Sequence, residues 1–231
     1  MKLIKPSFEI LTPARLDYNV GLNIIADIEK AARTCYQSEG KIEWDKDDEP
    51  VSGLKLVKKL LDRKHEAMLE FGPSITVKFI CDRGVSHELV RHRLASFAQE
   101  STRYCNYSND TNISFIIPSW LELEEDQNIK ITVPSEDQAM IWLRSMSRAE
   151  IDYNRLIAKG WTPQQARTVL PNSLKTSINI KANIREWRHI FKLRCAKTAH
   201  PQMRELMIPL LTDFQNHIPI LFDDLESIIG I

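Results

Sequence analysis

The sequence predicts a mixed α+β fold, in which a few strands stand among more abundant helices. Two segments, 72–82 and 174–183, alternate apolar and polar residues and are rich in β-branched side chains, as half-buried strands are. Longer segments, most clearly 51–64 and 135–159, carry apolar residues at helical spacing. No repeat and no linker rich in Gly, Ser or Pro divides the chain, so we expect a single domain over residues 1–231.

The N-terminal part of the chain is expected to form one strand and two helices. Residues 3–11 suggest an edge strand, and 20–36 an amphipathic helix rich in Ile, Ala and Leu. The charged segment 37–50 is loop-like. In 51–64, Leu and Val recur at helical spacing, and the lysines are expected to form a solvated face.

A further helix is expected to follow the strand at 72–82. It would be entered after Gly84, with Ser86 as an N-cap that satisfies a backbone N–H of the first turn. Its apolar positions lie at helical spacing: Val85, Leu89, Leu94 and Phe97. On such a helix, Glu88 and His92 would lie one turn apart on the same face.

The C-terminal half is expected to be mostly helical. The run NISFIIP at 112–118 predicts a strand that is closed by Pro118. A long helix from Ser135 to about Lys159 begins with a capping signal and ends at Gly160. The remaining elements are a short helix after Thr162-Pro163, the strand at 174–183, and helices at 183–195 and 200–215.

Composition disfavours several classes of function. Lys and Arg total 31 and so do Asp and Glu, so a broad nucleic-acid-binding surface is not indicated and any anion site must be local. The N-terminal run breaks at Pro6 and does not resemble a signal peptide, and no apolar run reaches membrane-spanning length. Four widely spaced cysteines without a C-x-x-C pair are most simply buried free thiols. We therefore expect a cytoplasmic protein without a membrane partner.

The chain has one dense group of cations and hydroxyls. Arg91-His92-Arg93 is followed after seven residues by Ser101 and then by Arg103-Tyr104. Because the planar fork of arginine suits bidentate binding of phosphate, this stretch is a candidate anion site. A solvated basic helix end is the competing interpretation, since cations also favour a helix C-terminus. Zinc binding is disfavoured, because the second histidine of the run 87–92 lies one residue too late for H-E-x-x-H.

The same residues resemble a known family. R-H-R-x7-S is the signature of the flavin-dependent thymidylate synthases, and the longer run RHRLASFAQESTRY is similar to their motif throughout. Further blocks follow the expected order: ARTCY near the N-terminus, HEAMLEF at 65–71, QQARTVLP at 164–171 and NIREWRHIFKLRCA at 183–196. The resemblance implies an α/β fold with a central sheet flanked by helices. It also implies a homotetramer whose active sites are shared between subunits.

FAD is the cofactor that the resemblance implies. None of the seven glycines belongs to a G-x-G-x-x-G or P-loop motif, so side chains must hold the phosphates. By resemblance, the FAD contacts are Ala67, Arg91, His92, Arg93, Gln99, Asn183, Ile184, Arg185 and His189. Ala67 stands where some relatives carry a hydroxyl residue. By the same resemblance, His65 and His200 are further candidates for the active site.

The nucleotide that the resemblance implies is dUMP. Its expected contacts are Glu88, Leu89, Val90, Arg91, Gln99, Glu100, Ser101, Thr102, Arg103, Arg167 and Arg194. Arg194, placed against the base, would favour the uracil anion at N3 and so enrich C5 in electron density, which makes it the candidate catalytic residue.

Two of these positions have competing interpretations. Ser101 has a histidine near it in sequence, but the motif supplies arginines rather than an aligned base. A hydroxyl that donates to the nucleotide phosphate is therefore favoured over a nucleophile. Glu88 replaces a glutamine of some relatives and would pair with His92 one turn on, or with an arginine.

The activity implied by the resemblance is the reductive methylation of dUMP to dTMP. The carbon donor is 5,10-methylenetetrahydrofolate, NADPH-reduced FAD supplies the hydride, and tetrahydrofolate is released. The reaction needs neither a metal nor a covalent enzyme nucleophile, and no cysteine lies in the active-site block of the cysteine-dependent thymidylate synthases. Two alternatives remain open: a nucleic-acid-binding module in which 91–103 contacts a phosphate backbone, and a degenerate member that binds flavin and nucleotide without turnover.

Overall fold

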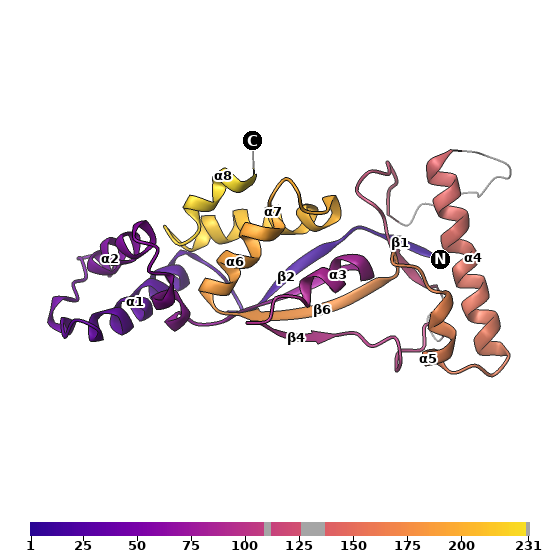
Figure 1. The fold of residues 1–231 in the computed structure, drawn as a ribbon, viewed down its shortest axis with the longest axis horizontal. Coiled ribbons are helices and arrows are strands. Elements are labelled where there is room, and N and C mark those ends of the chain that lie inside the picture. The colour runs from indigo at the N-terminus through magenta and orange to yellow at the C-terminus, as the bar shows by residue number, and fades with distance from the viewer. Residues whose placement is uncertain (109–111, 126–136, 230–231) are drawn as a thin grey trace. The chain divides into compact units, whose positions relative to one another are not determined.

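A computed structural model of the protein describes residues 1–108, 112–125 and 137–229 and has the mixed α/β architecture that the sequence predicts (Figure 1). Within these ranges the helices are α1 (Tyr18–Thr34), α2 (Val51–Asp62), α3 (Arg83–Leu89), α4 (Gln138–Ala158), α5 (Pro163–Ala166), α6 (Ile184–Arg194), α7 (Pro201–His217) and α8 (Glu226–Ile229). The strands are β1 (Lys2–Ile4), β2 (Ser7–Thr12), β3 (Ile75–Asp82), β4 (Ser96–Gln99), β5 (Ser114–Ile116) and β6 (Lys175–Ala182). Short 3-10 helices are η1 (Glu39–Lys41), η2 (Glu66–Phe71), η3 (Arg167–Val169) and η4 (Asp223–Leu225).

The strands form two sheets. Strands β1 and β5 pair in parallel, with Leu3 opposite Phe115. The larger sheet has the strand order β2-β3-β6-β4, so strands that are neighbours in the sheet can be distant in the sequence. Along β3 and β6, buried residues alternate with more accessible ones. This alternation confirms the strands predicted at 72–82 and 174–183.

The chain divides into two compact units. The first unit consists of Met1–Ser7, Phe79–Arg91 and Ala98–Asn179. The second unit consists of Phe8–Lys78, His92–Phe97 and Ile180–Ile231. The chain therefore passes between the units within β2, β3, β4 and β6, and again within the cationic motif, after Arg91.

The core of the first unit gathers apolar side chains from β1, β5, α4 and α5. Its buried members are Leu3, Tyr107, Ile113, Phe115, Ile117, Leu143, Met146, Tyr153, Ala166 and Leu174. The N-terminal amino group lies 2.7 Å from the Glu150 carboxylate of α4, so the start of β1 is tied to that helix. Burial of about ten such side chains is the main stabilising contribution to this unit.

The core of the second unit forms where α1, α2, α6 and α7 pack together. Four aromatic rings of α6, α7 and the segment after it lie with centroids 5.2–5.7 Å apart: Trp187, Phe191, Phe214 and Phe222. Trp187 also donates its indole N–H to the Ile75 carbonyl of β3, at 3.1 Å. A buried indole needs such a partner, and this bond fixes α6 against the sheet within the unit.

Most of the predicted helices are confirmed, and side-chain caps mark where several of them begin. The residues that accept a hydrogen bond from the first turn are Asp17 for α1, Asp137 for α4 and Asn183 for α6. Thr162 forms a capping box at the start of α5. The predicted capping signal of the long helix begins at 135–136, which lie outside the described residues. That helix ends as expected at Gly160, whose φ of +90° favours glycine.

The strand predicted at 3–11 is wrong in one respect. The segment forms two strands, β1 and β2, that join different sheets. Pro6 lies between them and has no backbone N–H to offer a neighbouring strand, so one continuous ladder is interrupted there. The part that follows the break, β2, is an edge strand as predicted.

The helix predicted after Gly84 is also partly wrong. It begins at Arg83, and its N-cap is Asp82, whose carboxylate accepts the Val85 N–H at 2.6 Å. It ends at Leu89, so no helical turn places Glu88 and His92 on one face. Leu94, an expected apolar position of that helix, is 72% exposed.

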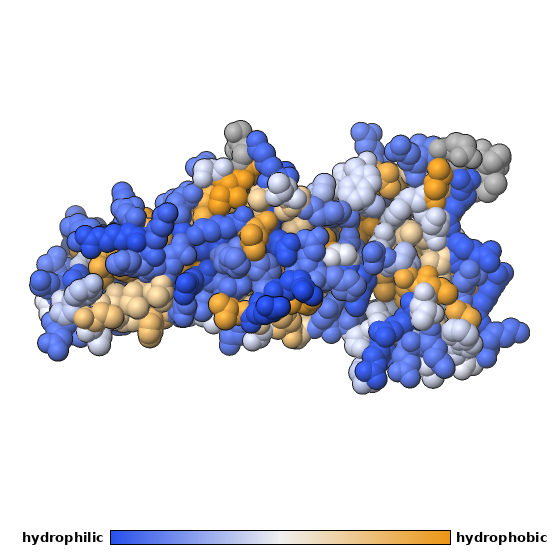
Figure 2. Space-filling model, viewed as in Figure 1, coloured by the Kyte–Doolittle hydropathy of each residue, from blue (hydrophilic) through white to orange (hydrophobic). Residues whose placement is uncertain are grey.

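Polar and charged side chains cover most of the face shown in Figure 2, where hydrophobic residues form separate small patches. None of the described helices combines the length and the hydropathy that a membrane span requires. The composition gives no net charge, which is consistent with charged groups of both signs over this surface.

Candidate active site

The cationic motif lies in a turn rather than on a helix. Val90 is the C-cap of α3, and residues 91–95 lead from it into β4. Arg91 and Arg93 are exposed, whereas His92 between them is 4% exposed. The turn therefore presents two arginines to solvent and directs the histidine inward.

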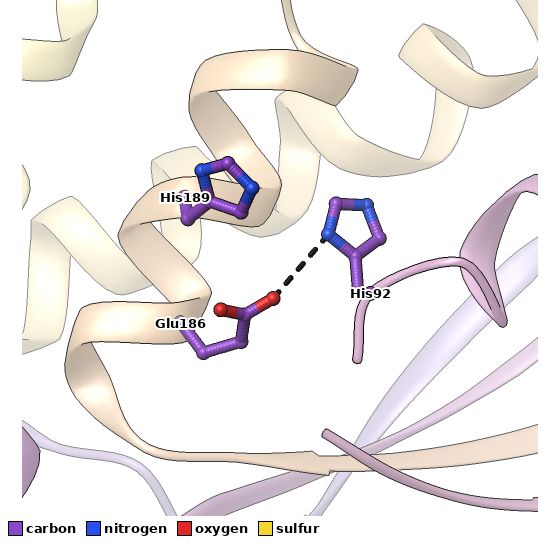
Figure 3. A group of neighbouring side chains, drawn as sticks. All are labelled: His92, Glu186 and His189. Atoms are coloured by element: carbon purple, nitrogen blue, oxygen red, sulfur yellow. Dashed lines mark ion pairs between the residues drawn. The ribbon is translucent and has the colours of Figure 1, made fainter. Parts of the chain in front are cut away.

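His92 joins a cluster on α6 within the second unit (Figure 3). Its Nε2 accepts a hydrogen bond from Arg194 Nε at 3.1 Å, and its Nδ1 lies 3.4 Å from Glu186 Oε1. The His189 ring stands edge-on to it, with centroids 5.7 Å apart. The structure thus brings together three residues predicted for the site, His92, His189 and Arg194.

Burial makes His92 a neutral residue. Desolvation, together with electrostatic interactions with Arg194 and His189, lowers its pKa from 6.5 to about 4. At pH 7 the contact with Glu186 is therefore between a carboxylate and a neutral imidazole. Burial also raises the pKa of Glu186, although His189 and Arg185 act in the opposite direction.

Several predicted site residues lie at the start of α6 or on it, and they differ in exposure. Asn183 uses its side-chain oxygen to cap the helix, accepting the Glu186 N–H at 2.9 Å. Ile184 is fully buried, so only its main chain is available to a ligand. Arg185 and His189 are exposed, and Arg185 lies 2.5 Å from the Glu70 carboxylate.

A cavity of about 730 Å³ lies in the second unit, within the range of small-molecule sites. His65, Ala67 and Arg185, all predicted from the sequence, line it. Its other cationic side chains are Arg33, Lys41, Lys59, Arg63 and Lys64. Glu66 also lines the cavity, and its carboxylate lies 2.8 Å from the Lys192 ammonium. The excess of cations suits an anionic ligand.

The first unit holds the other predicted group. Arg167 donates to the Thr102 hydroxyl at 2.9 Å, which joins two of the expected nucleotide contacts. The Ser101 hydroxyl accepts the Arg103 N–H at 3.3 Å, an arrangement typical of a turn. Arg103 itself is exposed, and its guanidinium carbon lies 5.4 Å from the centroid of the Tyr104 ring.

Gln99 and Glu100 are held by contacts inside the first unit. The Gln99 amide donates to Ser86 Oγ at 2.8 Å and to Thr176 Oγ1 at 3.2 Å. Glu100 accepts from the Lys175 ammonium and from the Tyr107 hydroxyl, each at 2.8 Å. Burial and the bond to Glu100 raise the pKa of Tyr107, so its hydroxyl stays a donor.

The remaining predicted residues are Glu88, Leu89, Val90 and His200, which are not among the contacts described above. Leu89 is fully buried, Val90 is exposed, and Glu88 lies on α3. His200 is exposed and precedes α7. The expectation that Glu88 faces His92 one turn on is wrong, because the helix ends between them. The carboxylate that lies beside His92 belongs to Glu186.

The sequence did not predict that Glu186 belongs to the site. Its position is separated from His92 by more than ninety residues, and a single acidic residue in the first turn of a helix is usually a favourable surface charge. The signal that could have found it is its place one turn before His189 on the same helix.

The α/β fold and these two groups of residues are typical of an enzyme, and their cationic side chains suit anionic ligands. Comparison with known proteins specifies the class. The family model described as "Thymidylate synthase complementing protein" matches residues 22–220. A flavin-dependent thymidylate synthase from Corynebacterium aurimucosum is 31% identical over 202 residues, covering 85% of this chain and 78% of the relative. The enzyme of the same name from Geobacter sulfurreducens is 29% identical over 199 residues, covering 86% and 81%.

Solved structures show the same fold. A UMP/dUMP methylase, PolB from Streptomyces cacaoi, has a TM-score of 0.72 at 21% identity and covers 100% of this chain and 98% of its own. Thymidylate synthase X from Helicobacter pylori, solved with FAD and dUMP, has a TM-score of 0.69 at 20% identity and covers 98% and 100%. The chain belongs to the flavin-dependent thymidylate synthase family. The family resemblance, the fold class and the flavin-dependent methyl-transferring activity predicted from the sequence are confirmed.

Proposed function

We propose that the chain converts dUMP to dTMP and that Arg194 activates the uracil ring. The observation that carries this proposal is the 3.1 Å bond between Arg194 and the histidine of the R-H-R motif. It places the predicted activating guanidinium beside the motif that is the family signature. The carbon donor is 5,10-methylenetetrahydrofolate, and NADPH is the reductant.

The residues present fit FAD as the cofactor. The cavity of the second unit is lined by cationic side chains, including Arg185, which can neutralise phosphates without a glycine-rich loop. The proposed FAD contacts remain Ala67, Arg91, His92, Arg93, Gln99, Asn183, Ile184, Arg185 and His189. When bound and reduced, FAD supplies the hydride. Ile184 would contribute through its main chain, because its side chain is buried.

The proposed nucleotide contacts lie in the segments 88–91 and 99–103, at Arg167 and at Arg194. Arg167, held by Thr102, and the exposed Arg103 offer donors for the phosphate. Ser101 offers its hydroxyl to the same group. Arg194 would stabilise negative charge that develops on the uracil at N3, which raises electron density at C5, the carbon that is methylated. Further proposed contacts are Glu88, Leu89, Val90, Arg91, Gln99 and Glu100.

We also propose that residues 1–231 act as one functional domain in a homotetramer with shared active sites. Large apolar side chains in the motif are exposed in the single chain: Leu94 by 72% and Tyr104 by 78%. Such positions are typical of surfaces that a partner covers. A cytoplasmic location is supported by Cys35, Cys81, Cys105 and Cys195, which are free thiols.

The proposal is tested with the purified protein. Its visible spectrum with added FAD is recorded, and dTMP is then assayed after adding dUMP, methylenetetrahydrofolate and NADPH. A yellow protein that makes dTMP only when all components are present supports the proposal, and UMP in place of dUMP tests sugar selectivity. A yellow protein without turnover indicates a degenerate member. A colourless protein that binds nucleic acid with a steep salt dependence would replace the proposal with a phosphate-backbone module.

A further inference from the structure

Three side chains of the second unit lie in a row: Glu186, His92 and Arg194. Glu186 and His92 are 5% and 4% exposed, so solvent competes little for their contacts. Figure 3 shows Glu186 beside the His92 ring, with His189 one turn further along the helix. At the other edge of the ring, His92 Nε2 accepts the Arg194 Nε hydrogen at 3.1 Å.

The Arg194 contact shows which nitrogen of His92 carries the proton. A guanidinium only donates hydrogen bonds, so Nε2 must present its lone pair and the proton of the neutral ring must be on Nδ1. Nδ1 lies 3.4 Å from Glu186 Oε1, where the carboxylate stabilises the Nδ1–H dipole. The depressed pKa of His92, about 4, keeps the ring neutral at pH 7.

We propose that Glu186 is a positioning residue: by fixing the tautomer of His92, it holds the Arg194 guanidinium in the orientation that faces uracil. This inference rests on the proposed role of Arg194 in activating the base. A long arginine side chain has many rotamers, and a buried acceptor that is itself fixed restricts them before the nucleotide binds. Loss of Glu186 would therefore leave the arginine in place but less well aimed.

Two other roles for Glu186 fit parts of the geometry. As the third residue of α6, an acidic side chain favours the helix N-terminus. With His92 and His189, Glu186 also offers ligand atoms that lie within 4.8 Å of one another, a set that suits a metal ion. A metal cation there would stand close to the guanidinium of Arg194, which is electrostatically unfavourable. The experiments must separate positioning from both roles.

The first experiment reads the tautomer of His92 directly, by 15N NMR of the imidazole nitrogens in the protein without ligands. The chain has six histidines, and the His92 signals are assigned by their loss in His92→Gln. Wild type is expected to show a protonated Nδ1 and a bare Nε2. Glu186→Leu is expected to lose this preference, whereas Glu186→Gln keeps it in part, because its amide oxygen still accepts. Metal content is measured on the same samples.

The second experiment is a double-mutant cycle on dTMP formation at saturating FAD, with flavin absorbance checked for each variant. Glu186→Leu is expected to lower kcat about tenfold, with a smaller change in KM for dUMP. His92→Gln still offers an acceptor to Arg194 but has no imidazole to link it to Glu186. In that background, Glu186→Leu is expected to cause little further loss. The exposed Lys197→Ala serves as the matched control and should behave as wild type.

Each outcome has a defined meaning. An unchanged tautomer in Glu186→Leu, or an equal loss of kcat in both backgrounds, would overturn the inference in favour of helix capping. A stoichiometric metal that disappears in Glu186→Leu would overturn it in favour of a metal site. A wild type with the expected tautomer but no dTMP formation would overturn the proposed function instead, since the tautomer is measured without turnover.

Discussion

At His92, burial and charge act in the same direction. Its ring is almost inaccessible to solvent, and electrostatic interactions with Arg194 and His189 act in the same direction, so the protonated form is disfavoured. A neutral ring can accept the hydrogen bond from Arg194, whereas a protonated ring could not. The protonation state of one residue is thus coupled to the placement of another.

This coupling predicts a pH dependence of stability. The folded protein binds a proton at His92 near pH 4, whereas an unfolded chain binds it near 6.5. Between these values the unfolded state holds more protons, so the free energy of unfolding should fall as the pH decreases, by up to ~3 kcal/mol from this group. Urea denaturation at pH 7 and pH 5 measures the change. His92→Gln, which has no proton to take up, should show a smaller decrease; an identical decrease would contradict the assignment.

Arg194 is expected to matter for chemistry more than for flavin binding. Arg194→Ala removes the donor that stabilises charge on uracil, and loss of such a group costs roughly 100-fold or more in kcat. FAD should remain bound, as its absorbance after gel filtration will show. Lys197→Ala removes a neighbouring exposed cation and is the control. Synthesis of dTMP that persists in Arg194→Ala would rule out the activating role.

At the scale of elements, α6 is the central support of the second unit. Besides Trp187, it carries Arg188, which is 1% exposed and lies 2.7 Å from both carboxylate oxygens of Asp224. Burial alone would raise the pKa of Asp224, but the hydrogen bonds and charge of Arg188 outweigh burial and lower it. In contrast, burial and the neighbouring acidic residues raise the pKa of Asp223. Arg188 therefore ties η4 to the helix through Asp224.

Two isosteric substitutions test this connection. Asp224→Asn should lower the free energy of unfolding by about 1–2 kcal/mol. The effect is smaller than for a fully buried ion pair, because the Asp224 carboxylate is half-exposed and solvent screens it. Asp223→Asn, one residue away, removes a charge that burial disfavours and should leave stability unchanged or slightly higher. The midpoints of urea denaturation at pH 7 compare the two variants with wild type. A larger loss of stability from Asp223→Asn than from Asp224→Asn would contradict the pairing of Arg188 with Asp224.

Elements with a strong local pattern were predictable from the sequence. Helices α1, α2 and α4 and strands β3 and β6 follow their hydrophobic periodicity, because each buries one face. Helix α3 was misjudged because the spacing of Leu94 resembles a helical pattern although that side chain faces solvent. Its start depends on Asp82, the last residue of β3, which the sequence pattern assigned to the strand alone.

The sequence predicted several residues of the candidate site but not how they are arranged. The family motif identified His92, His189 and Arg194, and the structure brings these three together. Glu186 and the ring of cations around the cavity depend on how distant segments fold back, which no local spacing encodes. The pKa of His92 likewise follows from burial, a property of the folded unit.

At the scale of the whole molecule, each of the two compact units contains some of the proposed nucleotide and flavin contacts. The exposed Leu94 supports an assembly in which another copy covers the motif. Leu94→Lys places a charge on that surface and should shift the mass measured by light scattering from that of the proposed tetramer toward fewer chains. Trp44→Lys, at another exposed apolar residue outside the motif, is the control. An unchanged mass in Leu94→Lys would contradict the proposal that another copy of the chain covers Leu94.

The most direct measurement is of the folate product. Protein, FAD, NADPH, dUMP and methylenetetrahydrofolate are incubated together, and dTMP and the folates are quantified by chromatography. Because the hydride comes from reduced FAD, tetrahydrofolate should appear in equal amount to dTMP, and NADPH should be consumed in the same proportion. Formation of dihydrofolate with dTMP, or dTMP without consumption of NADPH, would contradict a flavin-dependent synthase.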